Sequence, residues 1–256
     1  MDTPTPLKEE AEFLQEYANT LMGSGVHTSR VIRNTRRIGK SLGLDVKISL
    51  NHTSLVISVT HPQTQEIHNA VSMIPSLPIS FTMNSELSAL SWEAYDYHLS
   101  LDELRTKYEE IKSHQRLPHF LLLILVGLAN GSFCSLFGGS WIEDILVFFA
   151  TLAGFYAKER MLHYRVNNYI TWVLSAFIAS LTASVSLLLP STSEVAIATS
   201  VLYLVPGVPL LNGLIDVLEG HELAGCSRLL RALLLVICIA IGLSFTLLIV
   251  RNNLTL

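Results

Sequence analysis

The segment Val195-Ala-Ile-Ala-Thr-Ser-Val-Leu-Tyr-Leu-Val-Pro-Gly-Val-Pro-Leu-Leu-Asn-Gly-Leu-Ile-Asp-Val-Leu218 decides the fold of this 256-residue chain. It is apolar and long enough to cross a bilayer as a helix, which needs about 20 residues. Near its middle stand Pro206, Gly207 and Pro209, which remove two backbone donors and permit dihedral angles that a helix does not use. The segment is therefore predicted to form two half-helices, the second of which starts near Pro209.

Four more apolar runs accompany this segment. Together they predict an α-helical integral membrane protein with five transmembrane helices, one of them broken. The predicted spans are 117–137, 141–157, 169–189, 195–218 and 230–250. Half of the residues are hydrophobic and only 15% are charged, which argues against an ordinary soluble domain. The alternative, a large soluble protein with buried helices, needs an amphipathic shell that the sequence does not offer.

The distribution of Lys and Arg predicts the orientation in the membrane. Basic residues precede the first span and stand between spans two and three and between spans four and five, whereas the segments 138–140 and 190–194 carry none. We expect a multi-pass protein of the cell inner (cytoplasmic) membrane with a cytoplasmic N-terminus and a periplasmic or extracellular C-terminus. The first residues have no basic and apolar regions typical of a cleaved secretory signal.

The polar residues precede the apolar ones. Residues 1–114 are predicted to form a cytoplasmic α+β domain, and residues 115–256 the transmembrane domain. Ser100 and Glu103 fit a capping box, and Thr28 or Ser29 is expected to cap the second helix. The predicted elements are helices over 7–21, 28–42 and 84–98, a hairpin of strands 45–50 and 54–60, and a third strand over 66–73.

Several classes of function are disfavoured. The net charge of −4 offers no basic surface for nucleic acid. Three cysteines without paired spacing predict neither a disulfide framework nor a zinc site. No phosphate loop, nucleophile elbow or metal-spaced cluster occurs, so we expect no metal, no cofactor and no enzymatic activity.

The second half of the broken segment carries the first candidate site. A helix that begins inside the membrane presents free N–H groups and a positive dipole end, which favour an anion such as a carboxylate. Asn212, Asp216 and Glu219 lie on one face of this half-helix. Asn212 joins the proline–glycine break in the predicted substrate pathway, and Asp216 is the first candidate for proton coupling. Asp216 and Glu219 are equally interpretable as solvated charges at a helix end.

Two further polar groups lie in the first two spans. Asn130 and Ser132 interrupt a leucine-rich helix. They are expected either to hydrogen-bond to neighbouring helices or to contact the substrate. Asp144 follows Glu143 at the start of the second span. Both carboxylates are explained by the helix dipole, and a role of Asp144 in proton coupling or gating is the alternative.

A basic face is expected on the second helix of the cytoplasmic domain. Its candidate residues are Arg30, Arg33 and Arg37. Three interpretations remain open: a solvated surface, contact with the lipids of the inner leaflet, or capture of an acidic metabolite.

Two motifs resemble those of the threonine/serine exporter (ThrE) family: Gly25-Val-His-Thr-Ser-Arg-Val31, and Leu204-Val-Pro-Gly-Val-Pro209 with Asn212, Asp216 and Gly220. The resemblance covers nearly the whole chain and is greatest to the two-component branch of that family. It implies export of small carboxylates, with succinate as cargo of the two-component branch and threonine and serine as cargo of the single-chain branch.

The resemblance also implies a partner, because single-chain members have a second membrane half. A small YjjB-like membrane subunit is expected to complete a hetero-oligomer. Since no nucleotide-binding motif exists, the proton gradient is the expected energy source. The rival hypothesis is a membrane-anchored sensor or hydrolase that transports nothing.

Overall fold

A computed structural model describes residues 6–51, 53–114, 117–188 and 194–254, with side chains as far as Arg251. The chain divides into two compact units. The first comprises Met1–Gln115 and Gly207–Leu230, and the second comprises Arg116–Pro206 and Arg231–Leu256. The N-terminal part of the first unit therefore ends near the predicted domain boundary, and residues 207–230 join it. Two expectations concern residues outside the described ranges: the lack of a secretory signal in residues 1–5, and most of the segment 190–194, which carries no basic residue.

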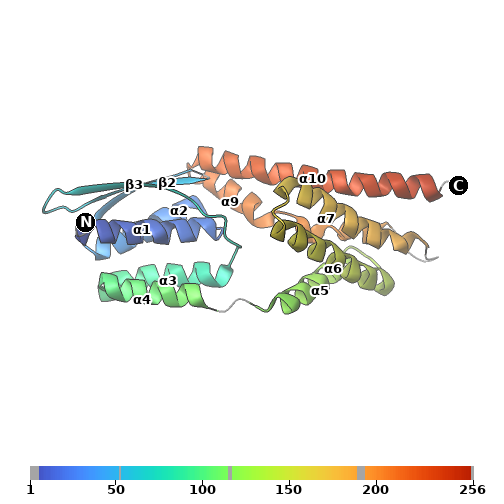
Figure 1. The fold of residues 1–256 in the computed structure, drawn as a ribbon, viewed down its shortest axis with the longest axis horizontal. Helices are drawn as coiled ribbons and strands as arrows, with labels where there is room; N and C mark the ends of the chain where they lie inside the picture. The colour runs from blue at the N-terminus through green and yellow to red at the C-terminus, as the bar shows by residue number, and fades with distance from the viewer. Residues whose placement is uncertain (1–5, 52, 115–116, 189–193, 255–256) are drawn as a thin grey trace. The chain divides into compact units, whose positions relative to one another are not determined.

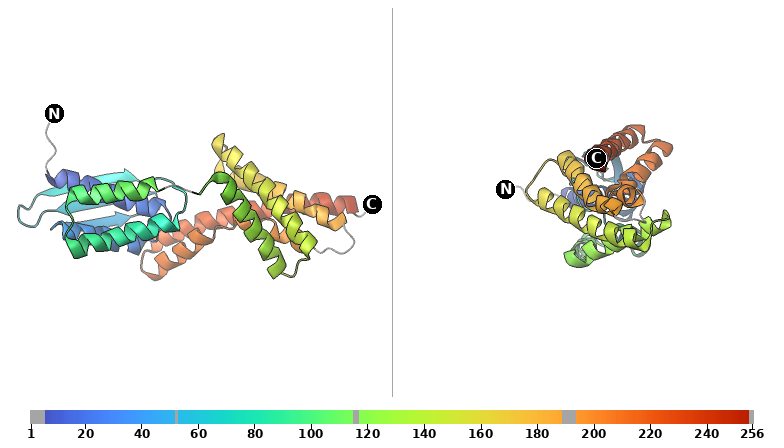
Figure 2. Two further views of the ribbon diagram at one scale, coloured as in Figure 1. Left: turned by 90° about the horizontal axis from the view of Figure 1, so that it is seen from below. Right: turned by 90° about the vertical axis from the view of Figure 1, so that its right-hand side faces the viewer.

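The first unit is built in three layers (Figures 1 and 2). A three-stranded antiparallel sheet in the order β1-β2-β3 forms one layer. Helices α1 and α2 lie next to the sheet, and α3 and α4 lie beyond them, with α2 packed against α3. These elements are α1 (Pro6–Gly23), α2 (Thr28–Ser41), β1 (Asp45–Leu50), β2 (Ser54–Thr60), β3 (Ile67–Met73), α3 (Phe81–Tyr97) and α4 (Leu101–Ser113). The predicted helices, the hairpin and the third strand are confirmed, as is the capping box of Ser100 and Glu103.

The join between α2 and β1 shows how the sequence sets this packing. Alternate residues of β1 are buried and exposed, as expected for a strand with one face on a core. A side chain at Gly39 would collide with Val46, so only glycine allows the helix to approach the strand this closely. Gly43 follows the helix with φ of 76°, a left-handed conformation that glycine adopts without strain.

The second unit is helical. It contains α5 (His119–Leu136), α6 (Trp141–His163), α7 (Asn168–Ala183), the 3-10 helix η1 (Ser184–Leu188), α8 (Val195–Thr199), η2 (Leu202–Leu204) and the later part of α10 (Glu222–Leu254). The pairs α5–α6 and α6–α7 pack along their lengths. Small residues form the seam: an added side-chain carbon at Gly154 of α6 would lie 2.8 Å from Ala179 Cβ. Such contacts let helix backbones approach closely in a membrane.

Three helices in the described residues are long and apolar enough to cross a membrane, namely His119–Leu136, Asn168–Leu188 and Glu222–Arg251. A bent pair, Val195–Leu204 with Gly207–Leu218, raises the number to four if it counts as one span. Helix α6 has the length of a span, but charged residues stand near both of its ends, and it is not among these helices. The five-span topology therefore stays a prediction.

The predicted break in the fourth apolar run is confirmed. The helix gives way to 3-10 geometry at Leu202–Leu204, Val205 is extended with ψ of 122°, and α9 (Gly207–Leu218) then begins. The start of α9 was predicted near Pro209 and lies two residues earlier. Pro209 is compatible with this position because the first turn of a helix has no intrahelical partners for its N–H groups.

Candidate functional site

The α9–α10 hairpin is the part of the first unit that carries the sequence-predicted acidic residues. Gly220, with φ of 84°, turns the chain between the two helices. Close approach requires glycine on both sides, because a side-chain carbon at Gly225 would lie 2.7 Å from the backbone oxygen of Gly213. Asn212, Gly213 and Asp216 are the buried residues of α9. The hairpin thus presents a polar face to the N-terminal residues of the same unit.

Asp216 is completely buried and caps α2 from the other end of the sequence. Its Oδ1 accepts a hydrogen bond of 2.7 Å from the backbone N–H of Thr28, the first residue of α2. The N-cap of α2 is His27, whose own side chain makes no capping bond. The expectation that Thr28 or Ser29 caps this helix is therefore wrong. A carboxylate at a helix N-terminus is stabilised by the free N–H groups and the dipole. Asp216 can therefore cap α2 in place of a side chain from the helix's own first residues.

Arg228, at the start of α10, neutralises this carboxylate. Its Nε lies 3.3 Å from Asp216 Oδ2, and the side chains are 7% and 0% exposed. Both terminal nitrogens donate to the backbone oxygen of Val26 at 3.1 Å. Arg228 is one of the basic residues between the fourth and fifth predicted spans that favour a cytoplasmic location for that segment. Its burial beside a carboxylate instead makes it half of a buried ion pair, because an unpaired buried charge is very costly.

The remaining polar residues of the hairpin also contact the segment 25–33. Asn212 donates to the backbone oxygen of Gly25 at 2.7 Å. Glu219 Oε2 lies 3.2 Å from His27 Nδ1. Burial lowers the pKa of His27, and the neighbouring Glu219 opposes this shift. The prediction that Asn212, Asp216 and Glu219 share a face is confirmed. Asn212 and Asp216, which were compared with the second family motif, contact Gly25 and Thr28 of the first.

In the second unit, Asn130 is a buried residue of α5 that joins three helices. Its Nδ2 donates to Thr151 Oγ1 at 2.6 Å and to the backbone oxygens of Thr199 and Ser200 at 3.2 and 3.3 Å. These two carbonyls lie where α8 ends, so they lack the partners that a continuous helix would supply. Asn130 thereby stabilises the frayed end of α8, which gives its amide nitrogen a structural role.

Ser132 and Asp144 line one cavity between α5 and α6, together with Ser135. The cavity measures about 490 Å³, and its walls are otherwise apolar. Ser135 Oγ donates to Asp144 Oδ2 at 2.6 Å. The other oxygen of Asp144 is buried without a hydrogen-bond partner in the described part of the chain. Glu143 forms a capping box with Ser140, so the two adjacent carboxylates differ: one caps the helix and one faces a cavity.

The three arginines predicted to form a basic face lie in three environments. Arg37 donates to Ser91 Oγ at 2.7 Å, and its guanidinium carbon lies 3.5 Å from the ring centre of Trp92. Arg33 lies 3.8 Å from the carboxylate of Glu219. Arg30 is half-buried. Arg37 therefore packs against α3, and Arg33 contacts Glu219 at the end of α9.

The structure thus places the sequence-predicted residues in separate sites. Asn212, Asp216 and Glu219 lie near the first turn of α2, and Ser132 and Asp144 line the α5–α6 cavity. Asn130 donates to the end of α8. Pro206 precedes α9, whose first turn contains Gly207 and Pro209. Arg228 was not anticipated as a site residue, and Thr28 was expected to cap α2 with its own side chain. The described ranges contain no group of three or more His, Cys, Asp or Glu side chains able to hold a metal ion.

Comparisons with known proteins show what the whole chain is similar to. A family model described as "Putative threonine/serine exporter" (ThrE) matches residues 12–250. The chain is 29% identical over 226 residues to "Probable succinate transporter subunit YjjP" of Klebsiella aerogenes, covering 87% of this chain and 86% of that protein. It is 27% identical over 231 residues to the protein of the same name from Escherichia coli K12, covering 87% of each chain. No solved structure matches the chain.

Proposed function

Because the chain belongs to the threonine/serine exporter (ThrE) family, we propose that it is the membrane subunit of a secondary exporter of small carboxylates, with a dicarboxylate such as succinate as its main cargo. The observation that carries this proposal is the similarity, over 87% of the chain, to two proteins named as succinate transporter subunits. Their names also support a partner. We assign that role to a small YjjB-like membrane subunit in a hetero-oligomer.

The proposed substrate pathway begins at the helix break. Pro206 precedes α9, and Gly207 and Pro209 lie in its first turn. A side-chain carbon at Gly207 would meet no atom within 4 Å. The free N–H groups and positive dipole end of α9 there suit a carboxylate. Discontinuous helices serve this purpose in other secondary transporters. Asn212 continues the pathway along α9. Ser132 and Asn130 are assigned to the part of the pathway in the second unit.

Asp216 is the proposed site of proton coupling. Its carboxylate holds both the first turn of α2 and the guanidinium of Arg228. A proton on Asp216 would remove the charge that stabilises these two contacts, and the α9–α10 hairpin would then be released from α2. Glu219 and Asp144 are the proposed gating residues. Asp144 supports this role through its unpaired oxygen in the α5–α6 cavity, since an intramembrane carboxylate is costly to keep without a partner.

The proposed location is the inner membrane, with five spans, the N-terminal α+β domain in the cytoplasm and the C-terminus outside. The experiment for this part is labelling of single cysteines with a membrane-impermeant maleimide in intact cells, in a chain whose three cysteines are replaced by Ala. Cysteine placed at Ser49 should stay unlabelled until the cells are opened, and cysteine at Gly139 should be labelled at once. The reverse pattern would contradict the orientation.

Transport itself is tested with purified protein in liposomes, with and without the small membrane subunit. Efflux of labelled succinate should require both proteins and a proton gradient. The variant with Pro206→Ala, Gly207→Ala and Pro209→Ala, which favours a continuous helix, should lose this efflux. Pro78→Ala, at an exposed loop position, is the matched control and should retain it. Full efflux by the triple variant would refute the broken-helix pathway, and no flux of any carboxylate would favour a sensor or hydrolase.

Threonine and serine are the second candidate cargo, since the description of the matching family model names them. They share with succinate the carboxylate that the start of α9 would receive. A competition assay in the same liposomes distinguishes the two cargoes. Excess unlabelled succinate should suppress the efflux of labelled succinate, whereas excess threonine should not. Suppression by threonine alone would assign the protein to amino-acid export.

A further inference from the structure

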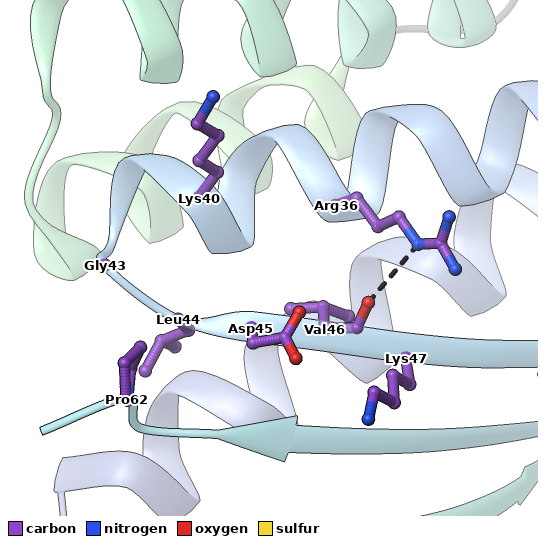
Figure 3. A pocket seen from close by; sticks show the side chains of 8 residues that line it. All are labelled: Arg36, Lys40, Gly43, Leu44, Asp45, Val46, Lys47 and Pro62. Atoms are coloured by element: carbon purple, nitrogen blue, oxygen red, sulfur yellow. Dashed lines mark hydrogen bonds between the residues drawn. The ribbon is translucent and has the colours of Figure 1, made fainter. Parts of the chain in front are cut away.

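A second hollow in the first unit lies at the C-terminal end of α2, away from the turn that Asp216 caps. It measures about 590 Å³ and lies between the last turns of α2, the start of β1 and the turn after β2, as Figure 3 shows. Buried Leu44 and Val46 line its base, and four charged side chains surround it: Arg36, Lys40, Asp45 and Lys47. None of these four belongs to the site described above.

The three cations of this hollow outnumber its one carboxylate, Asp45. In the parts of the chain that the structure describes, no carboxylate lies within 4 Å of Arg36, Lys40 or Lys47. Elsewhere in the unit, Lys107 lies 2.8 Å from a carboxylate of Glu93. An excess of clustered cations raises the local concentration of anions. The hollow therefore attracts an anion.

Arg36 is held in position for such a ligand. Its Nε donates to the backbone oxygen of Val46 at 3.3 Å, and Figure 3 shows this bond beside the hollow. Within the described residues neither terminal nitrogen makes a hydrogen bond. A guanidinium group fixed at Nε presents these two nitrogens as a fork that matches the oxygens of a phosphate. Lys47 shares the exposed face of β1 with Asp45, opposite to the face on which Val46 packs against Gly39 of α2. Because Lys47 also lines the hollow, it adds a point charge from that side of the strand.

Asp45 restricts what the ligand can be. A carboxylate in a basic hollow repels a bare polyanion, but it accepts a hydrogen bond from a hydroxyl group. The volume falls in the range of about 300–1,000 Å³ typical of sites for ligands larger than a four-carbon dicarboxylate. Lys40 extends toward α3, where its nitrogen lies 5.4 Å from the ring centre of Tyr95. These features suit a phosphate compound with hydroxyl groups and do not suit the proposed cargo.

We propose that this hollow binds a phosphate ester that carries hydroxyl groups, with Arg36 and Lys47 on the phosphate and Asp45 accepting from a hydroxyl. Two sources supply this chemistry: a free nucleotide, or the headgroup of phosphatidylglycerol. The ligand would contact the C-terminal end of α2, and Asp216 caps the N-terminal end of the same helix. Helix α2 therefore connects the hollow with the α9–α10 hairpin.

The test uses the full chain purified in detergent. Isothermal titration with ADP and with inorganic pyrophosphate measures the free-ligand arm. Native mass spectrometry of protein released from nanodiscs of phosphatidylglycerol or phosphatidylcholine counts retained lipids for the second arm. Arg36→Gln with Lys47→Gln should weaken the bound probe by at least roughly tenfold, as expected when two charge-assisted contacts are lost. Lys8→Gln, a surface change at a residue paired with Glu12, is the matched control.

Asp45→Asn separates the proposed geometry from simple charge attraction. The variant should bind pyrophosphate more tightly than the parent, because a negative charge is gone. It should not gain affinity for ADP or for phosphatidylglycerol to the same degree, because the acceptor for the hydroxyl is also lost. Circular dichroism of each variant shows whether it is folded.

Each outcome decides. ADP binding that the double variant loses identifies a nucleotide site, and phosphatidylglycerol retention that it loses identifies a lipid site. Binding of neither probe, or equal binding by parent and double variant, overturns the proposal. A uniform gain for all probes in Asp45→Asn would leave only non-specific attraction and would likewise overturn it.

Discussion

The two units bury opposite kinds of residue. In the first, the largest fully buried side chains include Tyr17, Leu14 and Ile57, as in proteins whose core forms away from water. In the second, buried positions are dominated by small or hydroxyl residues such as Ala179 and Ser175, while large apolar side chains such as Leu125 lie on the surface. Lipid offers such side chains an apolar environment, so helix packing relies on close contact instead. This is the difference expected between a core formed in water and helices packed in lipid. Helix α9 of the first unit follows the second pattern, since Leu211 and Leu218 are exposed.

The buried ion pair of the first unit gives the largest expected effect. Arg228→Met leaves Asp216 buried without its cation, which costs about 3–5 kcal/mol. We expect a large fall in the melting temperature of the detergent-purified chain. Arg105→Met is the control, since Arg105 is exposed and donates only to a backbone oxygen. The double change Asp216→Leu with Arg228→Met should recover much of the loss. If Arg228→Met melts like the parent, the pair does not hold the hairpin.

Matched leucine truncations test the comparison between the cores directly. Leu14→Ala removes a fully buried side chain and should cost about 2–5 kcal/mol through lost burial and a cavity. Leu125→Ala removes one that is 45% exposed on a helix apolar enough to span a membrane, and should cost less than about 1 kcal/mol in detergent. Thermal unfolding of both variants measures the difference. Equal losses would mean that α5 is packed as a water-soluble core helix.

Glycine substitutions examine the seam of the second unit. Gly154→Ala places a carbon 2.8 Å from Ala179 Cβ and 3.0 Å from the backbone oxygen of Ser175. Overpacking of this kind costs about 1–3 kcal/mol. Gly207→Ala meets no atom within 4 Å and should leave the melting temperature nearly unchanged. Size-exclusion chromatography and thermal melting in the same detergent check both. A destabilised Gly207→Ala chain with a stable Gly154→Ala chain would reverse this prediction.

The smallest expected effect is the pH dependence of the hairpin contact. Burial lowers the pKa of His27 below its ordinary value of 6.5, so the unfolded chain binds a proton there more readily than the folded chain. Stability from this source is complete above about pH 6.5 and is lost as the pH falls through the lowered pKa. Melting temperatures measured from pH 7.5 to pH 5 should decline less in His27→Gln than in the parent. Identical profiles would show that the neighbouring carboxylate cancels the effect of burial.

Local signals in the sequence were sufficient for most elements. Alternation predicted β1 and β2 because the sheet has one buried face, and Ser100 with Glu103 predicted the start of α4 because a capping box is complete within four residues. The proline–glycine run predicted the break because its cause is local backbone chemistry. Thr28 misled the assignment of the α2 cap, since the oxygen that accepts from its N–H comes from Asp216, 188 positions along the chain.

The sequence by itself determined an apolar, helical chain with a polar α+β part, a broken fourth run and the kinship of its motifs, because composition, periodicity and proline act at short range. Only the tertiary structure decided that residues 207–230 belong with the N-terminal unit, that Arg228 neutralises Asp216, and that Asp144 faces a cavity while Glu143 caps a helix. Each of these depends on which distant groups share a buried space, and the energy of a buried charge is set by those neighbours and not by its position along the chain.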